Sequence, residues 1–190
     1  MNERENVLVE RVLNGDLAAF EPLVEPYRKP MLGLAFRITR NGEDAKEVAQ
    51  EAFLRAFKYL KSFDLTKDFK SWMFQILVRA ARNYRHKQSK FEDLTMSAPV
   101  KEMAVATGRG PEFRHDGEEI RSRLSDCLDT LTPREREVFL LRDIEEMNIR
   151  ESARILKCSA VSVRVHLSAA RRKLRARIVE RHPELVEGGR

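Results

Sequence analysis

Two basic clusters contain the side chains of this chain that are best suited to bind a ligand. Their residue types indicate that the ligand is a nucleic acid. The first, from Arg79 to Lys90, contains no acid and follows an aromatic-rich stretch at 63–72. The second, from Arg164 to Arg177, has six Lys or Arg and again no acid. Aromatic rings beside cations suit a single strand, whose unstacked bases can lie on them. A basic helix behind a short turn suits the major groove of duplex DNA.

No arrangement of residues that would support catalysis accompanies these clusters. The histidines are scattered, at His86, His115, His166 and His182, and no phosphate-binding loop or His-Glu-x-x-His pattern occurs. Cys127 and Cys158 lack the spacing of a zinc site and fall near apolar helical positions, which favours buried inert thiols. We therefore expect neither an enzyme nor a bound metal or other cofactor.

Composition agrees with a folded protein that has an anionic partner. Of the 190 residues, 42% are hydrophobic and 35% charged, and the formal net charge is +6. The N-terminus resembles no secretory signal, and the apolar runs are too short to cross a bilayer. We expect a cytoplasmic protein with no direct membrane insertion.

The elements that must position the basic clusters are all predicted to be helices. Apolar residues from Ala45 to Leu60 recur at helical spacing and form one continuous stripe. No hairpin turn and no sustained alternation indicates a strand. Three prolines, Pro22, Pro26 and Pro30, leave the exact bounds of the helices before residue 40 open. Helices are predicted at about 4–14, 17–28, 30–40, 43–61 and 70–87.

An acid-rich segment separates the two clusters and predicts two domains. Residues 91–119 carry seven acids against three bases, with five prolines or glycines and no sustained period. Such a composition is typical of a mobile linker. The predicted organisation is a domain at 1–90, a linker at 91–117, a second domain at 118–182 and a tail at 183–190.

The second domain shows the start signals of a helix-turn-helix. Thr132 can cap a helix and Glu135 completes a capping box, with Pro133 in the first turn. Asn148 and Glu151 repeat that arrangement before a short helix. These spacings predict two helices that precede a third, DNA-reading helix.

The third helix is predicted to follow a break at 157–159, capped by Ser159 and continuing to about 177. Lys157 occupies a turn position where glycine is common. Arg164 could bond guanine bidentately, whereas the later bases suit phosphates. The residues that we predict to contact DNA from this helix are Ser162, Arg164, Val165, His166, Ser168, Arg171 and Arg172.

Three motifs in order resemble the extracytoplasmic-function sigma factors, group 4 of the sigma-70 family. DAKEVAQEAF at 44–53 and FKSWMFQI at 69–76 are similar to two segments of their region 2. LTPREREVF at 131–139 is similar to the opening of their region 4. The resemblance covers roughly residues 10–90 and 118–177. It implies an RNA polymerase subunit that directs core polymerase to −35 and −10 promoter elements and stabilises promoter opening.

The resemblance also implies the partners of each element. The helix at 43–61 would dock on the clamp helices of the polymerase β′ subunit, and region 4 on the β flap. The implied polymerase contacts are Asp44, Glu47, Gln50, Glu51 and Arg55. The linker would enter the RNA exit channel, and an anti-sigma factor would hold the free protein.

The −10 element would be held by the loop at 62–70 and the following helix, with one base flipped out of the non-template strand. The implied contacts are Lys67, Phe69, Lys70, Arg79, Arg82, Asn83 and Lys87. Spacing favours a core position for Trp72 over a role as a base platform. Arg79 and Asn83 depart from the family pattern, as do His166 and Ala169 on the reading helix, so no promoter sequence is predicted.

Two rival functions remain open from the sequence alone. A helix-turn-helix repressor or activator would bind duplex DNA as a dimer without being a polymerase subunit, but residues 1–90 carry no phosphoacceptor-type βα pattern. An enzyme acting on nucleic acid would need a metal-binding carboxylate cluster or a nucleophile, and neither can be placed.

Overall fold

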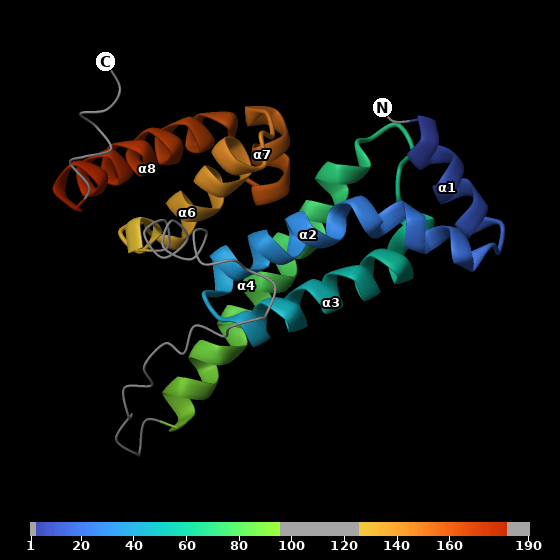
Figure 1. Cartoon of the computed structure of the whole chain (residues 1–190), viewed down its shortest axis with the longest axis horizontal. Helices are drawn as coiled ribbons and strands as arrows, with labels where there is room; N and C mark the ends of the chain where they lie inside the picture. Colours follow the sequence, from blue (N-terminus) through green and yellow to red (C-terminus); the bar gives the residue numbers. More distant parts are fainter. Residues whose placement is uncertain (1–2, 96–125, 182–190) are drawn as a thin grey trace. The chain divides into compact units, whose positions relative to one another are not determined.

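The computed structural model describes residues 3–95 and 126–181, and side chains as far as residue 88 in the first range (Figure 1). The chain divides into two compact units, Met1–Gly108 and Arg109–Arg190. Every regular element in the described ranges is a helix, so the predicted all-α fold with two helical domains is confirmed. The predicted linker from residue 96 onward and the tail at 183–190 lie outside the described residues, and the domain bounds stay predictions.

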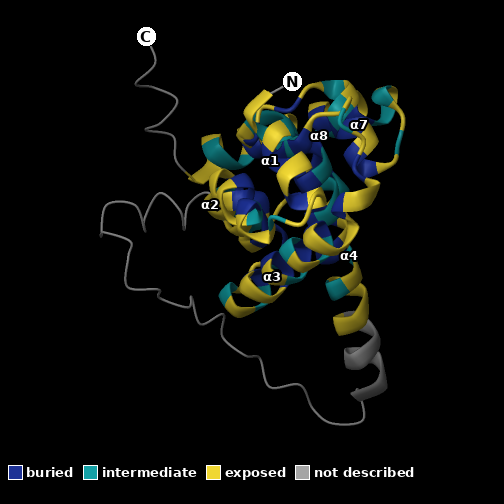
Figure 2. Cartoon of the chain, turned by 90° about the vertical axis from the view of Figure 1, so that its right-hand side faces the viewer, coloured by how far each residue is buried: buried dark blue, intermediate teal, exposed yellow. Residues whose placement is uncertain are grey.

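The first unit is built on three long helices. Its elements are α1 (Glu3–Leu13), η1 (Leu17–Ala19), α2 (Phe20–Thr39), α3 (Gly42–Tyr59), η2 (Leu60–Ser62) and α4 (Phe69–Thr95). Helices α2, α3 and α4 pack against one another. Their inner faces are buried and their outer faces exposed (Figure 2). Met31, Leu34, Phe74 and Leu77 are completely inaccessible to solvent and form the centre of this core.

Helix α2 differs from its prediction, because it runs without the break that we expected between residues 28 and 30. Pro22, Pro26 and Pro30 are spaced four residues apart and so lie on one side of the helix. Pro22 and Pro26 are exposed, and Pro30 is partly exposed. The carbonyls that lose a donor at Pro26 and Pro30 therefore lie towards water, which can replace the missing hydrogen bonds.

Helices α3 and α4 confirm their predictions and begin at side-chain caps. Asn41 Oδ1 accepts from the backbone nitrogens of Glu43 and Asp44, over 2.8 and 3.2 Å, at the start of α3. Asp68 Oδ2 accepts from Ser71 N over 2.7 Å at the start of α4. Helix α4 continues to Thr95, beyond its predicted end at 87. Residues 91–95, which we predicted as linker, therefore have helical backbone.

In the described part of the second unit, the helix-turn-helix region consists of three short segments and one long helix. They are α6 (Pro133–Phe139), the π-helical segment η3 (Leu140–Ile144), α7 (Ile149–Leu156) and the long α8 (Ala160–Arg181). Helix α8 packs on both α6 and α7. Val138, Leu140, Leu141, Val163 and Ala170 are completely inaccessible and fill the space between these elements.

All three predicted caps of this unit are confirmed. Thr132 and Glu135 form a capping box at α6, and Asn148 and Glu151 form another at α7. Ser159 Oγ accepts from Ser162 N over 3.0 Å at the start of α8. The π-helical turn was not predicted. There, Glu145 N donates to the carbonyl oxygen of Leu140, five residues earlier.

Candidate nucleic-acid interface

The turn between α7 and α8 sets the direction of the reading helix. Lys157 adopts the left-handed conformation, with φ 52° and ψ 54°, and ends α7. Cys158 N then donates to the carbonyl oxygen of Ala153 over 3.0 Å. Glycine adopts this left-handed conformation most readily. This is why a lysine at position 157 departs from the usual sequence pattern of such a turn. The three-residue turn at 157–159 makes α8 the second helix of a helix-turn-helix, which is the helix that enters the major groove in this motif.

Helix α8 buries one side and presents the other. Val163, Leu167, Ala170 and Leu174 lie in the core. Of the predicted DNA contacts, Ser162 and His166 are partly exposed, and five are exposed: Arg164, Val165, Ser168, Arg171 and Arg172. The structure thus brings the predicted residues onto the accessible sides of one helix.

A shallow hollow of about 410 Å³ lies beside the start of this helix. Three arginines line it, Arg142, Arg150 and Arg164, together with Asn148, Ile149 and Ala160. It opens where α7 and α8 begin, and helix N-termini attract anions. Sequence analysis missed Arg142 and Arg150 as candidate contacts. Only the positive charge of these two arginines could have suggested a contact with DNA, because the π-helical turn that carries Arg142 was not predicted.

Arg171 is held within the protein by an acid that the sequence did not suggest. Its Nε and Nη2 donate to the two carboxylate oxygens of Asp143 over 2.9 and 2.6 Å. Hydrogen bonding to Asp143, with the attraction of its charge, raises the pKa of Arg171. The side chain of Asp143 is only 20% exposed, whereas that of Arg171 is 57% exposed. The positive charge of Arg171 is therefore balanced before any DNA arrives.

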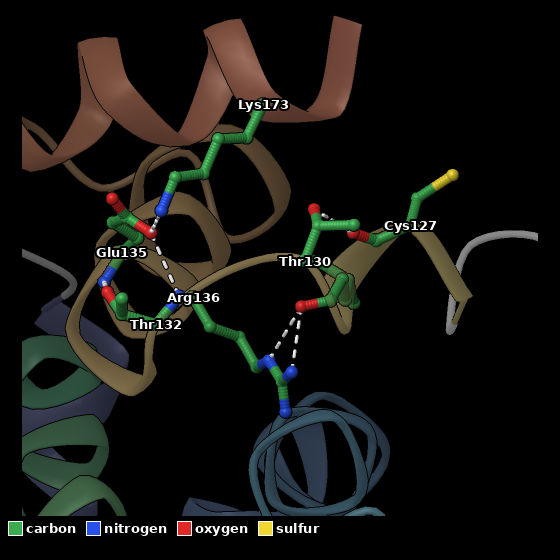
Figure 3. A network of polar contacts seen from close by, with 7 residues as sticks. Cys127, Thr130, Thr132, Glu135, Arg136 and Lys173 are labelled. Carbon is green, nitrogen blue, oxygen red and sulfur yellow. Dashed lines mark hydrogen bonds and ion pairs between the residues drawn. The ribbon is translucent and has the colours of Figure 1, made fainter. Parts of the chain in front are cut away.

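A polar network fixes α8 to α6 (Figure 3). Glu135 is 7% exposed, and its Oε2 accepts from Thr132 N over 2.8 Å and from Lys173 Nζ over 2.7 Å. Burial alone would raise the pKa of Glu135, but the hydrogen bonds from Lys173 and Thr132 outweigh burial and lower it. Arg136 donates from two nitrogens to the carbonyl oxygen of Leu128, over 3.1 and 2.7 Å. Lys173 is thus bound into the scaffold.

In the first unit, the predicted loop before α4 is organised by Asp64. Its Oδ1 accepts from the backbone nitrogen and the hydroxyl of Thr66, over 3.0 and 2.7 Å. Its Oδ2 lies 3.0 Å from Lys67 Nζ. The hydrogen bonds from Thr66, and then the one from Lys67, lower the pKa of Asp64 to about 2. Lys67 is therefore exposed on a loop whose turn is fixed by Asp64, and the Asp64 carboxylate partly neutralises its charge.

An aromatic cluster lies directly behind this loop, and it corrects the role expected of Phe69. The Phe69 ring is 2% exposed. Its centroid lies 5.3 Å from that of Phe63, 5.6 Å from Trp72 and 5.7 Å from Tyr27. A ring enclosed in this way cannot stack on a base without repacking the core. Trp72 packs on Phe63 at 5.0 Å but is only partly buried, so the expected core position holds for part of its ring.

The basic side of α4 continues away from this cluster. Trp72, Arg79, Asn83 and His86 recur at spacings of three, four or seven residues and so lie along one side. Arg79, Asn83 and Lys87 are exposed, while Arg82 is partly exposed. Lys70 Nζ lies 5.8 Å from the ring centroid of Phe74. The structure therefore places most of the predicted −10 residues on one accessible surface.

The predicted polymerase contacts lie on the outer side of α3. Gln50 is exposed, and Glu51 Oε1 accepts from Arg55 Nε over 2.5 Å. Asp44 Oδ1 accepts from the hydroxyl of Tyr84 over 2.8 Å, which ties the start of α3 to α4. Sequence analysis missed Leu54, which lies among these residues and is 59% exposed. The signal was available, because a leucine on the polar side of an amphipathic helix breaks its pattern.

Two further observations concern only the described residues. No cluster of three or more His, Cys, Asp or Glu that could hold a metal ion occurs among them. No described helix is both long and apolar enough to cross a membrane.

Comparison with known proteins gives matches to both units. The family model Sigma-70 region 2 matches residues 23–91, and the model Sigma-70, region 4 matches residues 121–174. The chain is 30% identical over 178 residues to the ECF RNA polymerase sigma-E factor of Escherichia coli K12, covering 88% of this chain and 90% of that protein. It is 29% identical over 175 residues to the RNA polymerase sigma-H factor of Pseudomonas aeruginosa, covering 89% and 91%.

Solved structures agree on the fold. The structure of CnrH in complex with the cytosolic domain of CnrY matches with a TM-score of 0.71 and 24% identity, covering 94% of this chain and 99% of that one. The sigma factor RpoE of Bartonella quintana, in complex with the anti-sigma factor NepR, gives a TM-score of 0.69 at 17% identity, covering 84% and 96%.

Proposed function

Because this chain belongs to the sigma-70 family, as an RNA polymerase sigma factor of the extracytoplasmic-function type, we propose a division of roles among its residues in transcription initiation. Sigma factors bind core RNA polymerase and promoter DNA, and polymerase itself makes the RNA. The membership favours this function over a free-standing helix-turn-helix regulator. The observation that best supports the division is the capped helix-turn-helix, whose reading helix exposes Arg164, Ser168 and Arg172.

The second unit reads the −35 element. Helix α7 crosses the DNA backbone, with Arg142 and Arg150 beside a phosphate, and the first turns of α8 reach base edges. Arg164 lines the same hollow and is exposed, so it reaches both base edges and phosphate. Arg172 lies two turns further along and contacts the backbone. Arg171 acts chiefly through Asp143, as a residue that positions α8.

The first unit holds the opened −10 element. The exposed side chains of Arg79, Asn83 and Lys87 contact the strand backbone, and Lys67 does so from the loop. Neutralising phosphates releases counterions, so this contact weakens as salt rises. Phe69 supports the surface by packing. The accessible part of Trp72, which packs on Phe63 and Phe69, offers an aromatic surface on which an unstacked base could lie.

The outer side of α3 docks on the β′ clamp helices, and the second unit on the β flap. Gln50 and Glu51 provide polar contacts, and Leu54 provides an apolar anchor between them and Lys58. An apolar side chain inside a polar rim is the usual composition of a strong protein contact. Asp44 contributes by fixing α3 to Tyr84 rather than through direct contact.

We expect an anti-sigma factor to bind the free protein in the cytoplasm. RpoE, which shares this fold, is bound to the anti-sigma factor NepR in its structure, and CnrH is bound to the cytosolic domain of CnrY. A partner that covers the outer side of α3 would compete with polymerase for Leu54 and Gln50.

Run-off transcription with purified core RNA polymerase and a panel of promoters tests the function directly. Initiation at a defined start site that depends on this protein supports it. Tight binding of the protein alone to duplex DNA, with no initiation on any template, would support a regulator instead.

The docking surface is tested by Gln50→Ala combined with Glu51→Arg, measured as affinity for core polymerase. The contacts proposed for both side chains are lost, so affinity should fall at least tenfold. Glu10→Arg reverses a charge on the exposed side of α1 and serves as the matched control. Wild-type affinity in the double variant would remove α3 from the interface.

A further inference from the structure

Two valines stand exposed on the first turns of the reading helix. Val161 is 64% exposed and Val165 is 60% exposed. They are four residues apart and so lie one above the other on the same side of α8. Val163 and Leu167, in contrast, turn into the core. Packing within the unit therefore does not explain why β-branched apolar residues occupy Val161 and Val165.

Their surroundings are those of a DNA contact. Val165 follows Arg164, which lines the arginine-rich hollow at the start of α7 and α8. Ser168 and Arg172 are exposed at one and two turns beyond Val165. A partner that fits this end of the helix must offer anionic groups and, between them, small apolar groups. Duplex DNA offers both, because the 5-methyl of thymine projects into the major groove between two phosphate backbones.

We propose that Val161 and Val165 determine −35 specificity by packing on thymine 5-methyl groups in the major groove. The proposal rests on the −35 reading assigned to this unit. One helical turn rises about 5.4 Å, against about 3.4 Å for one base-pair step, so the pair reaches methyls on neighbouring or next-neighbouring base pairs. Sequence analysis included Val165 among the contacts but not Val161, and it assigned neither of them a base.

Val179 provides an internal control for this reading. It is 48% exposed and lies fourteen residues after Val165, on nearly the same side of α8. Fourteen residues rise about 21 Å, which exceeds the major-groove width of about 12 Å. A helix whose first turns lie in the groove therefore carries Val179 past the base edges. Loss of an apolar side chain at Val179 should leave base preference unchanged.

Uracil tests the contact at the level of one methyl group, because it differs from thymine only in lacking the 5-methyl. Holoenzyme reconstituted from the full chain and core RNA polymerase is used to select from promoter duplexes randomised across the −35 region. The recovered sequences are then remade with uracil in place of each thymine. Removing one contacted methyl should weaken binding about fourfold, since burying a methyl-sized group is worth about 0.8 kcal/mol.

The variants Val161→Ser and Val165→Ser should each abolish one thymine–uracil difference, while Val179→Ser keeps both. All three sites are exposed, and Ser and Val have similar helix propensities, so the fold should be retained. Equal affinity of wild-type holoenzyme for thymine and uracil duplexes would overturn the proposal and leave the −35 assignment standing. Failure to enrich any −35 sequence would overturn both.

Discussion

The two units of this sigma factor hold their helices together in different ways. The first uses length, since α2, α3 and α4 have 20, 18 and 27 residues. The second relies more on end contacts, since α6 and α7 have only 7 and 8 residues beside the 22-residue α8. Every helix leaves about four amides and four carbonyls unpaired at its ends, whatever its length. Short helices therefore depend more on capping, and both short helices here have complete capping boxes.

Buried polar groups divide the units in the same way. Among the described residues, the buried polar or charged side chains are Glu135, Arg136, Glu137, Glu145 and Ser152 in the second unit, but only Ser71 in the first. The buried interior of the first unit is thus almost entirely apolar, whereas the second unit adds buried directional contacts, which respond to pH and charge, to its apolar core. The second unit is thus the one with more buried charge among the described residues.

The largest expected effect tests the apolar side of this comparison. Phe74→Ala removes a ring with no solvent exposure from the contact of α4 with its neighbours, and should cost about 3–5 kcal/mol of stability. Hydrogen exchange of peptides from each unit should show lost protection between residues 20 and 81 but not in α6 to α8. Leu54→Ala, at an exposed site, should leave both units protected. Lost protection in both units would show that they unfold together.

The next effect tests the polar side. Glu135→Ala removes the reciprocal cap of α6 and leaves Lys173 without its partner. A cap and a hydrogen bond to a charged group together should cost about 2–3 kcal/mol, measured by denaturant unfolding. Glu135→Gln is the matched control, because it keeps the capping box and loses only the charge. A smaller loss in the Ala variant than in the Gln variant would contradict this account.

Acidic pH should destabilise the second unit before the first. The pKa of Glu135 is lowered in the folded protein, so its contribution is present above the ordinary glutamate pKa and is lost as pH falls through the lowered one. Exchange protection in α6 and α8 should therefore fall as pH drops below the ordinary glutamate pKa of 4.5, and less so in Glu135→Gln. Earlier loss in the first unit would reverse the comparison.

A third effect concerns the charges of the reading helix. Arg172 is exposed and forms no ion pair within the described part of the chain, whereas Arg171 is paired with Asp143. Arg172→Ala should lower the salt slope of −35 binding by about one, and Arg171→Ala by much less. Asp143→Asn should raise the slope by freeing Arg171. Equal slopes for the two arginine variants would mean that DNA displaces Asp143.

The smallest effect concerns the turn. Lys157→Gly relieves a left-handed residue and should stabilise the second unit by about 0.5–1 kcal/mol. Lys157→Ala keeps a Cβ in the same conformation and should give no such gain. Thermal unfolding measures both variants, and a gain in the Ala variant would attribute the effect to the lysine charge instead.

Local features of the fold could be predicted, because they depend on residues close in sequence. Thr132 with Glu135, Asn148 with Glu151, and Ser159 were found as caps for this reason. The continuity of α2 was not, since it depends on which side of the helix the prolines face after packing. The type of an aromatic residue cannot separate a base platform from a core ring, so Phe69 was misplaced.

Contacts between distant residues were beyond sequence reasoning altogether. Asp143 and Arg171 are 28 residues apart, and the π-helical turn that carries Asp143 has no sequence pattern of its own. The candidate site was therefore found by residue type and position, while the balance of its charges was not.

The π-helical turn also indicates where this chain could lose a residue. A π turn spans one more residue than an α turn, so deleting Arg142 would leave four residues, an ordinary α-helical spacing, between the bonded groups of Leu140 and Glu145. The deletion would remove the hydrogen bond from Arg142 to the carbonyl oxygen of Met147 and turn Asp143 away from Arg171. A relative shorter by this residue would then lack the positive charge of Arg142 in the hollow and present Arg171 to DNA without its internal partner.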